Sequence, residues 1–168
     1  MINEVTLRNC IDFAINTEER GTNFYQQLAD RFSDNEEIAR LFTRLSRDEL
    51  NHKQQFTSVL SNLPPENADA RPVEKLDYLR AMSTPDFFYD KDGPFENLER
   101  IADRDDALEM AFNFEKATLA FYQAVEDIFG QNEPLNQIIE AEKLHISNLM
   151  TAMMVEGSRF RSVDDRWY

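Results

Sequence analysis

The chain has 168 residues, a length typical of one domain, and its 42% hydrophobic and 30% charged residues indicate a globular protein rather than a disordered one. Only 4 glycines and 6 prolines are present, so a mostly helical fold is favoured over an all-β fold with many tight turns. The 18 Lys and Arg residues against 32 Asp and Glu residues give a formal net charge of −14, which excludes a basic face for nucleic acid or an anionic membrane.

Cys10 is the only cysteine, so the chain can form no internal disulfide and no Cys-x-x-Cys metal or redox site. The N-terminal residues lack the basic and apolar segments of a signal peptide, and no apolar run approaches the ~20 residues that span a bilayer. We therefore expect the protein in a reducing cytoplasm, away from membranes.

Apolar residues recur at spacings of three and four in four long segments, which predicts four amphipathic helices. We expect these helices at about residues 5–32, 34–63, 103–129 and 133–156. Ser33 is the expected N-cap of the second helix, with Glu36 as its capping-box partner, and Gly130 is the expected end of the third.

Residues 64–102 differ from the flanking segments because they contain most of the prolines. We expect a short helix from Val73 to Met82 and otherwise an irregular crossover, in which Phe87-Phe88-Tyr89 covers the bundle or marks a subunit contact. A connection of this length lets the third long helix begin at the same end of the bundle as the second. The prediction is therefore one all-α domain, residues 1–168, folded as a four-helix bundle with one long crossover.

Each apolar stripe is interrupted near its middle by an ionisable residue, in a position that an aliphatic side chain would otherwise take. The only two histidines both follow a stripe glutamate by three residues, a spacing that puts carboxylate and imidazole on one helix face. The six residues are Glu18, Glu49, His52, Glu115, Glu142 and His145. In two antiparallel hairpins, all six fall at a similar level of the bundle.

The order of these residues repeats in the two halves of the chain. In each half a glutamate is followed seven residues later by a tyrosine, Tyr25 or Tyr122, and then by the Glu-x-x-His pair of the next helix. These tyrosines are either core aromatics with satisfied hydroxyls or donors to a ligand carboxylate. Asp48 either orients a histidine across the bundle or is solvated, and Ala141 at the equivalent place in the other half favours the solvated interpretation.

Four ionised carboxylates cannot be buried together alone, because each loses its hydration and they repel one another. Two divalent cations would balance the four charges, and a donor set of carboxylate and imidazole suits iron, manganese or zinc better than magnesium or calcium. We expect two non-haem iron ions, with zinc or manganese as alternatives, because in the absence of a thiolate site any redox chemistry must occur at this pair.

The order Glu…Glu-x2-His…Glu…Glu-x2-His resembles that of the ferritin-like di-iron carboxylate proteins. The segments Glu18–Tyr25 and Asp48–His52 are similar to the di-iron domain of rubrerythrins. The resemblance spans about residues 8–155 and implies a ferritin-like bundle in which the six residues bind iron and carry the reaction, with Glu49 and Glu142 as bridging ligands. It also implies an oxidoreductase of oxidative-stress defence that acts on peroxide or dioxygen, and a homodimer.

Two features differ from the rubrerythrin pattern. The chain lacks the cysteines of a rubredoxin domain, so the resemblance implies that a separate protein donates the electrons. Thr118 stands where rubrerythrins have an extra carboxylate one turn beyond Glu115, so the six-ligand set is more similar to bacterioferritin-type centres. A ferroxidase or iron-storage protein, and a non-redox metal-stabilised helical scaffold, therefore stay open as alternatives to the oxidoreductase.

Overall fold

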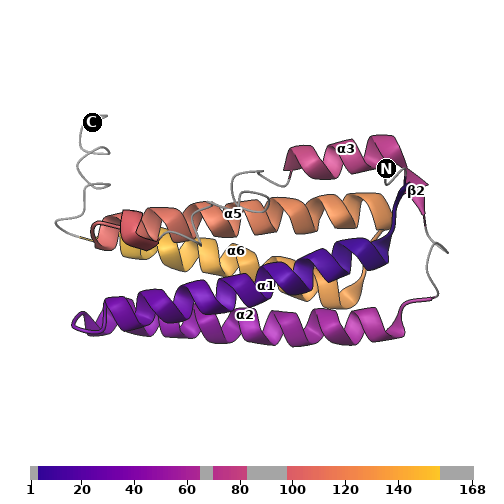
Figure 1. Cartoon of the computed structure of the whole chain (residues 1–168). Coiled ribbons are helices and arrows are strands. Elements are labelled where there is room, and N and C mark those ends of the chain that lie inside the picture. Colours follow the sequence, from indigo (N-terminus) through magenta and orange to yellow (C-terminus); the bar gives the residue numbers. More distant parts are fainter. Residues whose placement is uncertain (1–3, 65–69, 83–97, 156–168) are drawn as a thin grey trace.

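The computed structural model describes residues 4–64, 70–82 and 98–155, whose four long helices form an all-α, ferritin-like bundle (Figure 1). The first hairpin consists of α1 (Leu7–Arg31) and α2 (Glu36–Asn62). The second consists of α5 (Arg104–Phe129) and α6 (Glu133–Met153). The bundle expected from the spacing of the apolar residues is thus confirmed.

Each long helix begins at a side chain that accepts a hydrogen bond from the backbone N–H three residues further on. These N-caps are Thr6, Asn35, Asp103 and Asn132. The prediction of Ser33 as the cap of α2 is wrong, because the backbone N–H of Asn35 bonds to the carbonyl of Phe32 and the chain is still turning there. α5 ends at Gly130, whose φ of +91° is a backbone conformation that glycine adopts without strain.

The segment between the hairpins contains more regular structure than the sequence indicates. The strand β1 (Glu4–Val5) pairs antiparallel with β2 (Arg71–Pro72), and α3 (Val73–Met82) is the short helix expected there. α3 packs along α5, and the 3-10 helix η1 (Leu98–Arg100) precedes α5. Phe87-Phe88-Tyr89 lie outside the described residues, as does the tail 158–168.

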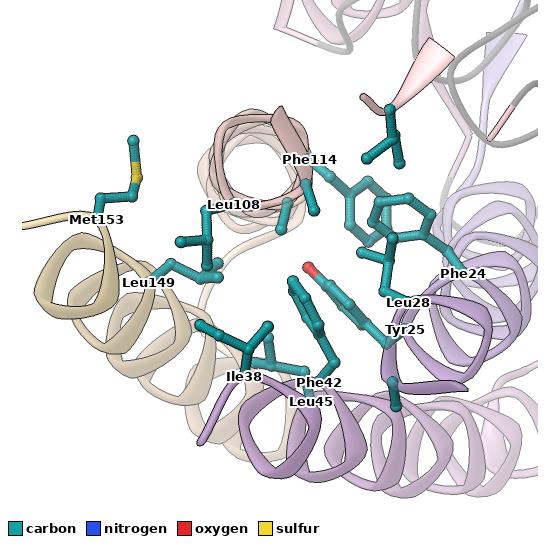
Figure 2. Close-up of a cluster of buried hydrophobic side chains, with 14 of the residues drawn as sticks. Phe24, Tyr25, Leu28, Ile38, Phe42, Leu45, Leu108, Phe114, Leu149 and Met153 are labelled. Atoms are coloured by element: carbon teal, nitrogen blue, oxygen red, sulfur yellow. The ribbon is translucent and has the colours of Figure 1, made fainter. Parts of the chain in front are cut away.

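Two apolar clusters fill the bundle, one toward each end. The cluster near the α1–α2 turn includes Leu28, Phe42 and Leu149 (Figure 2), and the cluster near Gly130 includes Phe56 and Ile138. On α1, α2 and α6 the inward-facing glutamates and histidines lie between the two clusters in the sequence, and on α5 the inward-facing glutamate lies near the end of the first cluster's stretch. The fold brings them into one polar layer. None of the helices in the described ranges is long and apolar enough to cross a bilayer.

Candidate metal centre

Six ionisable side chains meet in the polar layer, and each is at most 4% exposed. α1 and α5 each contribute one glutamate, while α2 and α6 each contribute a glutamate and a histidine on one helix face. The residues are Glu18, Glu49, His52, Glu115, Glu142 and His145. The structure therefore brings together all six residues that the sequence singles out.

The donor atoms fall into two groups that share two glutamates. Atoms of Glu18, Glu49, His52 and Glu142 lie within 4.8 Å of one another, and we call this group the His52 position. A second group within the same limit, the His145 position, combines Glu49, Glu115, Glu142 and His145. Because Glu49 and Glu142 belong to both groups, they have the arrangement that bridging ligands require.

Both imidazoles present Nδ1 to the carboxylates. Nδ1 of His52 lies 3.1 Å from Oε1 of Glu142 and 3.7 Å from Oε2 of Glu18. Nδ1 of His145 lies 3.3 Å from Oε2 of Glu115 and 3.5 Å from Oε2 of Glu142. The two rings face each other with centroids 5.5 Å apart, so both nitrogens point into the same small space.

Several buried oxygen and nitrogen atoms of the polar layer have no hydrogen-bond partner among the residues that the structure describes. They are Oε2 of Glu18, Oε1 of Glu49, both carboxylate oxygens of Glu142 and Nδ1 of His52. An unpaired buried polar group costs about 1–3 kcal/mol. These oxygens and nitrogens face one another and have the donor chemistry of a divalent transition-metal site, so the residues fit a bound metal.

Two buried tyrosines hold the outer glutamates from the opposite helix. The Tyr25 hydroxyl donates to Oε1 of Glu115, and the Tyr122 hydroxyl donates to Oε1 of Glu18. Burial and then the neighbouring glutamates raise the pKa of both tyrosines well above its ordinary value, so both stay protonated donors. Figure 2 shows the Tyr25 ring beside Phe42, with which it stacks at a centroid distance of 6.1 Å.

Asp48 contacts a histidine across the bundle, and the favoured solvated interpretation is wrong in this respect. Its Oδ2 lies 3.4 Å from Nε2 of His145, and the side chain is 31% exposed. The hydrogen bond with His145 lowers the pKa of Asp48 below its ordinary value. The solvated interpretation assumed that the two halves are symmetric, because Ala141 at the equivalent position cannot contact a histidine through a polar group. The halves differ at this position.

Protons compensate the buried charges when no metal is bound. Burial and then repulsion from Glu142 raise the pKa of Glu115 to about 8. Burial lowers the pKa of His52, but the nearby carboxylates of Glu142 and Glu18 outweigh this and raise it to about 10. A metal ion must displace these protons at neutral pH, because only the deprotonated groups are ligands.

Gly21 makes room for Glu49, a role that the apolar stripe alone did not reveal. A Cβ at Gly21 would lie 3.1 Å from Oε2 of Glu49 and 3.0 Å from Cε1 of Phe114. The signal in the sequence is a glycine inside a helix, which usually has a packing reason. The equivalent residue of the other half, Thr118, donates its hydroxyl to the backbone carbonyl of Glu115 at 2.9 Å.

Fold and site together define a ferritin-like bundle with a buried carboxylate–histidine cluster. The Rubrerythrin family model matches residues 9–102, more than half of the chain, so the chain belongs to the rubrerythrin family. This match includes Glu18, Glu49 and His52, whereas the ligand candidates of α5 and α6 lie beyond it. No curated protein and no solved structure matches the chain. The family and the cluster together indicate a metal site.

Metal removal should make the protein increasingly unstable as the pH rises from about 5 to about 9. The pKa of Glu115 is about 8 in the folded chain against 4.5 in the unfolded chain, and that of His52 is about 10 against 6.5. The folded state therefore binds more protons over this range, so its free energy of unfolding falls with rising pH. Thermal unfolding with EDTA should show this decrease and thermal unfolding with Zn²⁺ should not. An equal pH dependence of both forms would contradict the site.

Replacement of Gly21 by Ala should weaken metal binding, although Ala is the better helix former. The helix gains about 1 kcal/mol at most, whereas overpacking a buried position costs about 1–3 kcal/mol. The added Cβ would lie 3.0 Å from Phe114 and 3.1 Å from Glu49, so both buried side chains must shift to make room for it. We expect a lower Zn²⁺ affinity by calorimetry, with the exposed substitution Asn23→Ala on the same helix as control. If Gly21→Ala binds zinc like the wild type, the space at Gly21 is not needed.

Proposed function

We propose that the protein is a non-haem di-iron oxidoreductase that reduces peroxide or dioxygen with electrons from a separate donor protein. The observation that carries this proposal is the pair of overlapping donor groups with Glu49 and Glu142 in common. Two ferrous ions bound at these positions would supply the two electrons that reduce one peroxide to water. The surrounding carboxylates and aromatic side chains would hold the two ions and control access to them.

The carboxylates have different tasks in this proposal. Glu18 and Glu115 each belong to one position, and the tyrosine hydroxyls of the opposite helices fix one oxygen of each. Glu49 and Glu142 belong to both positions and have buried oxygens without a hydrogen-bond partner in the described part of the chain. These two side chains can therefore reorient as the charge between them changes, while the outer pair keeps its place.

The aromatic side chains next to the layer restrict what can reach it. Tyr25 stacks on Phe42 toward one end of the bundle, and Tyr122 packs on Phe56 toward the other at a centroid distance of 5.1 Å. These rings keep bulk water out, which strengthens the electrostatic interactions inside. A centre enclosed in this way favours a reactant as small as peroxide or dioxygen over a bulky organic substrate.

The surface charge supports a second candidate, a ferroxidase that passes iron on for storage. A net charge of −14 attracts cations and would raise the local concentration of ferrous ions. In that case the two positions would be an entry point for iron and not the seat of a retained cofactor. The two functions differ in how much iron a chain takes up.

Reaction of the ferrous protein with peroxide tests the proposal. The wild type should retain two iron ions per chain and consume about one peroxide per ferrous pair. The change in near-ultraviolet absorbance measures this oxidation. Glu142→Gln removes a negative charge that both metal positions share, so the rate of peroxide reduction should fall by at least about 100-fold. Loss of a residue that only supports a ligand costs about 10- to 100-fold, and loss of a shared ligand should cost at least the upper value. Glu140→Gln is the matched control, because Glu140 is 71% exposed and its ion pair among the described residues is with Lys143, at 2.6 Å.

The alternatives give other results in the same experiment. Oxidation of many ferrous ions per chain, with the product retained in a large particle, would support the ferroxidase. Retention of zinc without any reaction of the ferrous protein with peroxide or dioxygen would contradict the oxidoreductase and support a metal-stabilised scaffold.

A further inference from the structure

The metal centre has a near-twofold internal symmetry. Each donor group combines three carboxylates with one imidazole, and the two groups share Glu49 and Glu142. The hydrogen bond from Tyr25 to Glu115 has its counterpart in the hydrogen bond from Tyr122 to Glu18. Since the number and type of donors are the same, any difference between the two positions must come from groups outside the donor set.

One charged residue breaks this symmetry. Asp48, directly before Glu49, places Oδ2 at 3.4 Å from Nε2 of His145. The equivalent residue before Glu142 is Ala141, which has no polar group to offer His52. Both carboxylate contacts of His52 are made through Nδ1, and within the described ranges no carboxylate lies within 4.0 Å of its Nε2.

A carboxylate at the far nitrogen of a ligating imidazole has a known physical effect. It accepts the proton of Nε2, so it fixes the tautomer in which Nδ1 carries the lone pair, and it makes that nitrogen a stronger ligand. It also restrains the ring. Asp48 in turn forms an ion pair with Arg44, whose Nε lies 3.7 Å from Oδ2 of Asp48. His145 thus presents Nδ1 to the carboxylates in a prepared orientation, whereas His52 has no such support.

A surface pocket lies toward the Gly130 end of the bundle, on the same side of the polar layer as His52. This pocket of about 370 Å³ lies between α2 and α6, and its lining includes Gln55 and Gln137. These residues are one helical turn from His52 and Ala141, respectively, and away from Asp48.

We propose that Asp48 is a positioning residue that makes the two metal positions unequal, so that the His145 position binds a divalent cation more tightly and fills first. This inequality presupposes the two-ion centre of the proposed function. The His52 position is then the one that exchanges its ion with solution. The difference in affinity does not depend on the reduction of peroxide or dioxygen, so it can be measured with a redox-inactive metal.

Calorimetric titration of the EDTA-treated, dialysed protein with Zn²⁺ tests the inequality. The wild type should show two binding steps per chain whose dissociation constants differ by about tenfold or more. Asp48→Ala should raise the dissociation constant of the tighter step by about 10- to 100-fold and bring the two steps together. Asp48→Asn keeps an acceptor oxygen without the charge and should fall between the two.

Further variants assign the steps to the positions. His52→Ala should remove the weaker step and His145→Ala the tighter one. Ala141→Asp supplies the missing carboxylate on α6 and should tighten the weaker step. Titration with Co²⁺ gives a second readout, because the visible absorption of the first equivalent should change in Asp48→Asn and stay unchanged in Ala141→Asp.

The outcomes separate this inference from the function on which it rests. Thermal unfolding of the EDTA-treated Asp48 variants should stay cooperative, with a transition temperature only slightly below that of the wild type, since the side chain is 31% exposed although it contacts His145. Two equal steps in the wild type, or an unchanged tighter step in Asp48→Ala, would overturn the role of Asp48 and leave the two-ion centre intact. Failure of the wild type to bind Zn²⁺ or Co²⁺ would overturn the centre itself.

Discussion

Burial of four glutamates at one level of the bundle is the constraint on which the rest of the structure depends. Each is at most 1% exposed, and the pKa of Glu115 and Glu49 rises because burial and their neighbours disfavour the charged form. Two imidazoles and two tyrosine hydroxyls provide part of the compensation, but they leave oxygens of Glu18, Glu49 and Glu142 without a hydrogen-bond partner in the described chain. Such a layer lowers the stability of a bundle that has no cation in it. Its presence on all four long helices therefore indicates a function and not a contribution to folding.

The bundle bears this unfavourable layer because apolar packing surrounds it on both sides. One cluster around Leu28, Phe42 and Leu149 and another around Phe56 and Ile138 supply the burial that holds the helices together. The same packing fixes the register of the helices, so the polar side chains arrive at a common level. The rings that border the layer serve both purposes, since Tyr25 and Tyr122 pack against phenylalanines and donate to the glutamates with the same side chain.

The buried cluster of four glutamates and two histidines could be predicted from the sequence, because ligand chemistry and helix geometry both impose a period. A glutamate and a histidine three residues apart are informative only when they interrupt an apolar stripe, and here the interruption occurs at matching places in two halves. Contacts that depend on the register between helices could not be predicted in this way. Asp48 meets His145 only because α2 and α6 pack side by side at that level, and no spacing within α2 encodes it. The cap at Asn35 and the two-residue pairing of β1 with β2 were missed for a related reason, since several polar residues can cap a helix and so short a strand has no period.

In the proposed two-ion centre, donors that are the same at both positions and neighbours that differ would distinguish the two ions without changing the donors themselves. A change of donor would alter the charge of the whole layer, and the compensation described above would have to be rebuilt. A change beside a donor leaves that balance intact, as the pair Gly21 and Thr118 shows, since neither side chain brings a charge to the layer. Asp48 and Ala141 differ in charge, but Asp48 lies at the partly exposed edge, where Arg44 and solvent offset much of its cost. The two halves can therefore differ in how firmly each imidazole is held while the buried core of the centre stays the same.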